Sequence, residues 1–111
     1  MIINTYSINV VQGDTLNVNL NYTGIDGAIV NLSGYTLNAG LMSRYGSSGY
    51  LGTLTPTLVN NGVSGVVNLT MPATGTAALL VQRAVYDIKA TSGNTVSKIF
   101  GGSFYVYPEV Y

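Results

Sequence analysis

The residues that could carry acid–base or metal chemistry are few in this sequence. Four of its 111 residues are acidic, and histidine and cysteine are absent. The carboxylates stand far apart along the chain, at Asp14, Asp26, Asp87 and Glu109. Hydrolytic sites ordinarily use a base that titrates near neutrality, a pair of carboxylates, or a metal ion. We therefore expect no enzyme, no cofactor and no metal site, unless folding brings two of these carboxylates together.

The basic residues are equally few, and they balance the acidic ones to a formal net charge of +0. They are Arg44, Arg83, Lys89 and Lys98. Nucleic acids and anionic membranes bind basic surfaces, so neither is an expected partner. Residues 1–4 lack the basic segment of a signal peptide, and no apolar run is long enough to span a bilayer. So little charge favours a surface that partners cover in an assembly over one solvated by Asn, Thr and Ser.

Tyrosine is the residue type that most suggests binding, with nine copies in the chain. Tyr45 and Tyr50 flank a loop rich in Gly and Ser, while Tyr105, Tyr107 and Tyr111 crowd the C-terminus. Tyrosine supplies a large contact area at a small entropic cost and is enriched in protein interfaces. These five residues are the candidate protein-interface residues.

The elements that must position these tyrosines are predicted to be short strands. From Leu16 to Tyr22, apolar residues alternate with Asn, which places one apolar row on one face of a strand. Similar patterns predict strands at residues 6–10, 35–41, 54–59, 67–71, 84–90, 95–100 and 103–107. Pro56 would confine its strand to an edge or a bulge. Residues 73–82 are expected to connect two strands through a single helical turn, capped by Thr74 or Thr76.

Seven or eight short antiparallel strands at a spacing of roughly ten residues are typical of an immunoglobulin-like β-sandwich. We therefore expect an all-β fold and one such domain over residues 1–111, with a closed barrel as the alternative. Residues 12–15 predict either a hairpin or a bend that takes the chain to the other sheet. In the last strand, Phe104 and Val106 should face the core, and Tyr105 and Tyr107 the opposite side.

Several short motifs, in order along most of the chain, resemble a group of small bacteriophage virion proteins with an immunoglobulin-like sandwich. The motifs are residues 12–16 (QGDTL), 31–36 (NLSGYT), 65–69 (GVVNL), 86–88 (YDI) and 101–110 (GGSFYVYPEV). The group usually has a glycine ahead of the YDI strand, where this chain has Arg83, Ala84 and Val85. It also carries more charge in and after the third strand, where this chain keeps only Arg44. These departures leave open which face meets a partner.

The resemblance implies an accessory part of a virion, attached to the capsid shell or to the tail and baseplate. The leading hypothesis is a non-enzymatic capsid decoration or cement protein, and the alternative is a tail or baseplate adaptor. The expected partners are major capsid or tail proteins in a homo-oligomer or multi-copy assembly, within a virion made in the host cytoplasm. A hypothesis of another class is a carbohydrate-binding or adhesion module with Tyr45, Tyr50 and Tyr105 as its platform, although the chain has no Trp.

Overall fold

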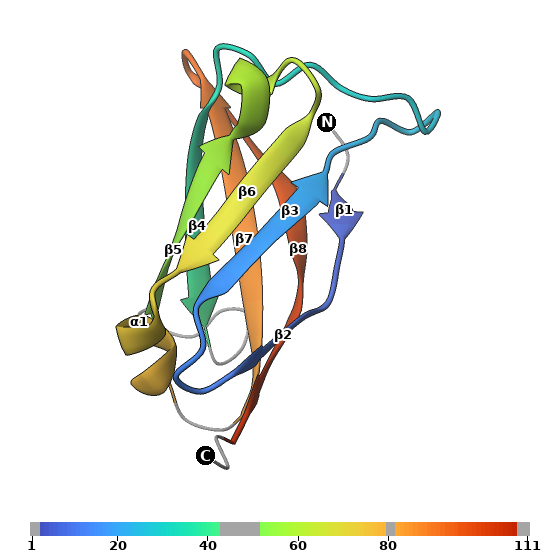
Figure 1. Cartoon of the computed structure of the whole chain (residues 1–111). Coiled ribbons are helices and arrows are strands. Elements are labelled where there is room, and N and C mark those ends of the chain that lie inside the picture. Colours follow the sequence, from blue (N-terminus) through green and yellow to red (C-terminus); the bar gives the residue numbers. More distant parts are fainter. Residues whose placement is uncertain (1–2, 43–51, 80–81, 109–111) are drawn as a thin grey trace.

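The computed structural model describes residues 3–42, 52–79 and 82–108, which fold into strands with two short helical turns (Figure 1). The strands are β1 (Asn4–Thr5), β2 (Ile8–Val11), β3 (Leu16–Asn21), β4 (Thr36–Met42), β5 (Gly52–Leu58), β6 (Val66–Met71), β7 (Gln82–Ser92) and β8 (Thr95–Tyr107). The helical turns are the 3₁₀ turn η1 (Val59–Gly62) and the α-helix α1 (Ala73–Ala77). The all-β fold expected from the sequence is thus confirmed.

The strands form two layers that share β5. The order along the whole path is β1-β8-β7-β4-β5-β6-β3, and β2 also pairs with β8. The first part of β5 pairs with β4, up to Leu54 opposite Ala39, and the second part, from Thr55 onwards, pairs with β6. Pro56 lies just after this change of sheet, where β5 has left β4. Its missing N–H therefore costs no hydrogen bond to β4, as expected for an edge position.

The topology is that of an immunoglobulin-like sandwich, with β3 and β6 in one layer and β4, β7 and β8 in the other. The expectation that all strands pair antiparallel needs one correction, because β1 and β2 run parallel to β8. The sheet is therefore mixed. Its strand order is open between β3 at one end and β1 and β2 at the other, which argues against the closed-barrel alternative. The bend over residues 12–15 takes the chain from one layer to the other, since β2 pairs with β8 and β3 with β6.

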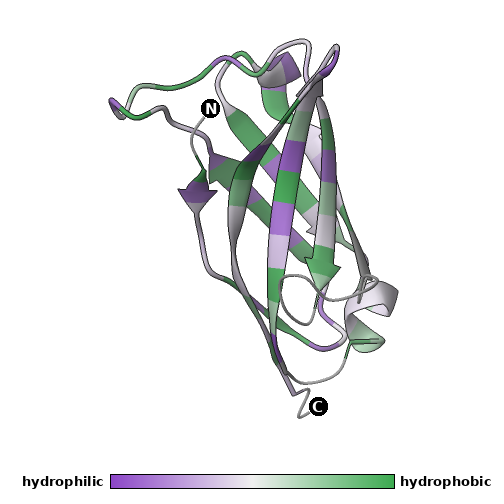
Figure 2. Cartoon of the chain, turned by 180° about the vertical axis from the view of Figure 1, so that it is seen from behind, coloured by the Kyte–Doolittle hydropathy of each residue, from purple (hydrophilic) through white to green (hydrophobic). Residues whose placement is uncertain are grey.

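The core lies between the layers and takes alternate residues from each strand. Figure 2 shows hydrophilic and hydrophobic residues alternating along several strands. A register shift opposite Ile88 and Lys89 lets two neighbours in β8, Ile99 and Phe100, both enter the core. The buried apolar side chains include Leu16, Leu20, Tyr22, Leu41, Leu54, Val67, Leu69, Tyr86, Ile88, Ile99, Phe100, Phe104 and Val106.

The helix α1 holds the corner between β2 and β3. Thr76 is fully buried, and its hydroxyl accepts a hydrogen bond from the Gly13 N–H (3.1 Å) and donates to the Asp14 carbonyl (2.7 Å). The Gln12 side chain also donates to the Leu79 carbonyl at 2.6 Å. The predicted cap was wrong, because Pro72 occupies the N-cap position and no side chain caps the helix. Thr76 bonds the distant corner instead.

Candidate protein-binding face and edge cavity

The C-terminal end of β8 carries two of the predicted interface tyrosines on its outward face. Phe104 and Val106 are buried in the core, Tyr105 is half-buried, and the Tyr107 side chain is 49% exposed, as the strand alternation predicts. The register places Asn9 of β2 and Arg83 of β7 on either side of Tyr105, and Val11 beside Tyr107. We call the outward side chains of Asn9, Val11, Arg83, Tyr105 and Tyr107 the tyrosine face.

One contact and one pair of neighbouring side chains define the chemistry of the tyrosine face. The Arg83 guanidinium carbon lies 5.8 Å from the centre of the Tyr105 ring, which is a cation–π distance. Val11 and Tyr107 are both exposed apolar or aromatic side chains on neighbouring strands. The face therefore combines aromatic area with a single cation, a composition enriched in protein interfaces.

Three of the five predicted interface tyrosines fall on residues that the structure does not describe. Tyr45, Tyr50 and Tyr111 lie outside the described residues, as does Glu109. Within the described part of the chain, no group of three or more acidic residues could hold a metal ion. The Asp26 carboxylate accepts a hydrogen bond from the Ala28 N–H (3.1 Å), which is the structural role expected of an aspartate in a turn.

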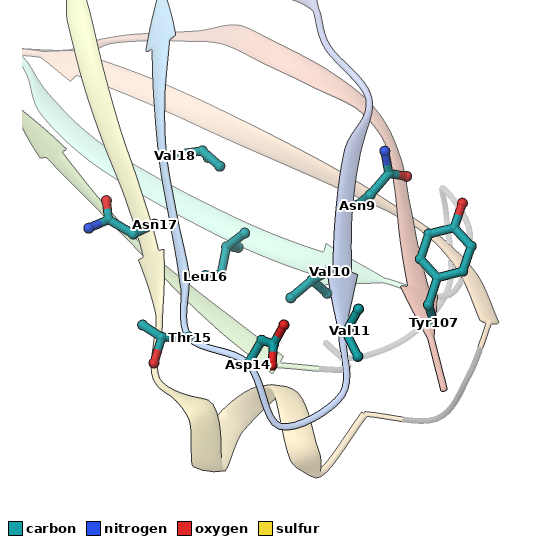
Figure 3. A pocket seen from close by; sticks show the side chains of 9 residues that line it. All are labelled: Asn9, Val10, Val11, Asp14, Thr15, Leu16, Asn17, Val18 and Tyr107. Carbon is teal, nitrogen blue, oxygen red and sulfur yellow. The ribbon is translucent and has the colours of Figure 1, made fainter. Parts of the chain in front are cut away.

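A cavity of about 270 Å³ opens beside the tyrosine face, between β2 and β3 (Figure 3). We call it the edge cavity, because β2 and β3 are the outer strands of their two layers. Val10, Leu16 and Val18 point into the space between the strands, and Asp14 lies at the end closed by the chain bend. The remaining lining residues are Asn9, Val11, Thr15, Asn17 and Tyr107. The edge cavity and the tyrosine face thus share Asn9, Val11 and Tyr107.

A second exposed apolar region lies at the opposite end of the molecule, where the β3–β4 connection extends beyond the sheets (Figure 1). Ile25 is 90% exposed at the tip of a turn closed by a hydrogen bond from the Gly27 N–H to the Gly24 carbonyl (2.9 Å). Ile29 follows it, also exposed. The sequence does carry a signal for this tip, an isoleucine placed directly before an Asp-Gly turn, which we did not predict as a site. No sequence signal marks the edge cavity, because the cavity depends on which strands lie at the edges of the two layers.

Comparison with known proteins places this chain in no family. No protein-family model matches the sequence, and no curated protein matches it. Among solved structures, the chain is similar to part of a family 123 glycoside hydrolase from Clostridium perfringens that is described for glycolipid glycan hydrolysis. The identity is 12% and the TM-score is 0.39, over 99% of this chain and 24% of the hydrolase chain. This chain therefore spans about a quarter of that hydrolase.

In the part of the chain that the structure describes, no helix is long and apolar enough to cross a membrane.

Proposed function

We propose that this chain is a non-enzymatic structural protein of a bacteriophage virion, and that it decorates and stabilises the capsid shell as a cement protein. The observation that supports binding most directly is the tyrosine face, an exposed aromatic and aliphatic surface on a domain with a formal net charge of +0. Exposed apolar area of this kind marks protein contact surfaces on soluble domains. The assignment to a virion comes from the ordered sequence motifs.

A cement protein binds across the junctions between shell subunits and buries apolar area there. Its expected partner is the major capsid protein, and it would be present in many copies. The tyrosine face suits this contact because Tyr107 and Val11 offer exposed apolar area, while Arg83 adds one charged group for orientation. Location as a tail or baseplate adaptor is the second candidate within the same class, and it would use the same face.

The experiment is a decoration assay with purified shells that lack this protein. The double variant Val11→Ser, Tyr107→Ser removes the exposed apolar area, and we expect it to lose roughly thirtyfold or more in affinity for the shell, as for a hot-spot residue. The double variant Thr55→Ser, Thr57→Ser is the matched control, because both residues are exposed on β5, in the other layer. Equal binding by both variants would refute the tyrosine face as the contact.

Copy number separates the two locations. A cryo-EM reconstruction of particles that contain the chain should show hundreds of copies if it covers the shell and six to a few tens if it lies in the tail. A protein that stays monomeric and is absent from particles would refute the virion role altogether. Tight, saturable binding on a glycan array would favour the adhesion hypothesis instead.

A further inference from the structure

The edge cavity lies beside main-chain groups that pair with no neighbouring strand in the part of the chain that the structure describes. On the β2 side, the N–H groups of Tyr6 and Gln12 donate to the carbonyls of Gly101 and Tyr107, at 3.3 and 3.0 Å. Successive residues of a strand direct their main-chain groups to alternate sides. The main-chain N–H and C=O groups of Ile8 and Val10 therefore point toward β8. Those of Asn9 point the other way, toward the edge cavity.

The same reasoning fixes the direction of the β3 main chain. The Tyr22 N–H donates to the Gly65 carbonyl at 2.7 Å, on the side of β6. Alternation then turns the main chain of Leu16, Val18 and Leu20 toward β6. The main-chain groups on the other, open side of β3 belong to Asn17, Asn19 and Asn21. No strand lies beside β3 on this side in the described sheet.

At the far end of this open edge, side chains of the N-terminal segment occupy the place of a strand. The Tyr6 hydroxyl donates to the Asn21 carbonyl at 2.9 Å. The Asn4 amide group donates to the Thr23 carbonyl (2.9 Å), and its oxygen accepts from the Thr23 N–H (3.2 Å). This end of the edge is therefore covered. Among the described residues, the uncovered part is the stretch of Asn17, which lines the edge cavity, and Asn19.

We propose that the edge cavity docks one extended segment of a protein partner. The segment adds to the free edge of β3, inserts two aliphatic side chains toward Val10 and Val18, and places a basic side chain beside Asp14. Free main-chain donors and acceptors in strand spacing are the recognition element for strand addition. The cavity volume of about 270 Å³ equals that of roughly nine waters, enough for two aliphatic side chains but not for a folded element.

Charge identifies the third feature of the partner segment. Among the described residues, Asp14 is the one charged residue that lines the edge cavity, and it is exposed at the closed end. A segment that runs antiparallel to β3 ends beside Asp14, so its lysine or arginine belongs at its C-terminal end. This docking site rests on the proposed function in one respect, which is that the partner is a protein.

The test uses the isolated protein labelled with ¹⁵N and the synthetic peptide Thr-Val-Thr-Val-Thr-Lys, acetylated and amidated. We expect saturable shifts of the Asn9, Asn17 and Asn19 amide signals, together with slower hydrogen exchange of the Asn17 and Asn19 amides. Replacing both peptide valines by serine should weaken binding roughly tenfold or more, since two buried aliphatic groups are lost. The Asp14→Asn variant should weaken binding roughly two- to fivefold, as expected for an exposed ion pair, and should not affect a peptide with glutamine in place of lysine.

Three results would overturn the docking site. The first is no saturable shift up to millimolar peptide. The second is equal binding by a peptide that carries N-methyl groups on the amides facing β3, because main-chain pairing would then play no part. The third is slower exchange of the Asn17 and Asn19 amides on raising the protein concentration without peptide, which would make a second copy of the chain the occupant. If the peptide fails while the protein still decorates shells, the docking site falls and the proposed function stands.

Discussion

The hydrogen bonds of Thr76 predict that a small substitution at this residue lowers the free energy of unfolding substantially. Thr76→Val keeps the shape of a fully buried side chain but removes the hydroxyl that bonds the Gly13 N–H and the Asp14 carbonyl. A buried polar group left without a partner costs about 1–3 kcal/mol. Water can reach part of this corner, because Gly13 is half-buried and Asp14 exposed. We therefore expect the variant to lose about 2 kcal/mol of unfolding free energy.

The measurement is urea denaturation at 25 °C, with thermal unfolding as a second readout. For a domain of this size, a loss of about 2 kcal/mol corresponds to a decrease in Tm of roughly 8 °C. Thr74→Val is the matched control, since Thr74 lies in the same helix with an exposed side chain, and it should change stability by less than about 0.5 kcal/mol.

A third variant separates the hydroxyl from the methyl group. Thr76→Ser keeps the hydroxyl and should lose about 1 kcal/mol or less, through the missing methyl group alone. The Gly13 amide signal should move in Thr76→Val and stay in place in Thr76→Ser, because only the first change removes its acceptor. If Thr76→Val were no more costly than Thr74→Val, the idea that α1 fixes the corner of the edge cavity would be refuted.

Two further predictions concern the contacts of the N-terminal segment, at Tyr6 and at Asn4. Gly102→Ala should destabilise the fold by about 2–4 kcal/mol in urea denaturation, because a Cβ there would lie 2.4 Å from the Tyr6 carbonyl oxygen and φ is 152°. Gly27→Ala, also at positive φ but with no atom within 4 Å, should cost about 1 kcal/mol, and equal losses would contradict the crowding. Asn4→Ala should speed hydrogen exchange of the Thr23 amide, which loses its acceptor, and an unchanged exchange rate would show that the side chain does not cover this edge.

Some of the fold was open to prediction because it depends on local patterns. Alternation over residues 16–22 marked the buried side of β3, and Leu16, Leu20 and Tyr22 are indeed buried. Val18 is only half-buried, because it borders the edge cavity as well as the packed core. Strand patterns report which side of a strand is apolar, but they do not report which neighbour lies beside it.

Pairing between distant segments escaped prediction for the same reason. The parallel pairing of β1 and β2 with β8 joins the two ends of the chain, and nothing local in either segment specifies it. The local sequence predicts Thr74 or Thr76 as a helix cap, yet the Thr76 hydroxyl bonds Gly13 and Asp14, more than sixty positions away. A hydroxyl can serve either partner, and only the folded arrangement selects one.

By itself the sequence determined the all-β class, the single small core and the outward direction of Tyr105 and Tyr107, because these follow from the period of two along a strand. It also determined the scarcity of charge and the absence of histidine and cysteine, and hence the expectation of a binding protein. The tertiary structure alone decided that β2 and β3 are the two edges that face each other across the edge cavity. Whether a strand lies at an edge is a property of the whole sheet, because it depends on where all the other strands pair.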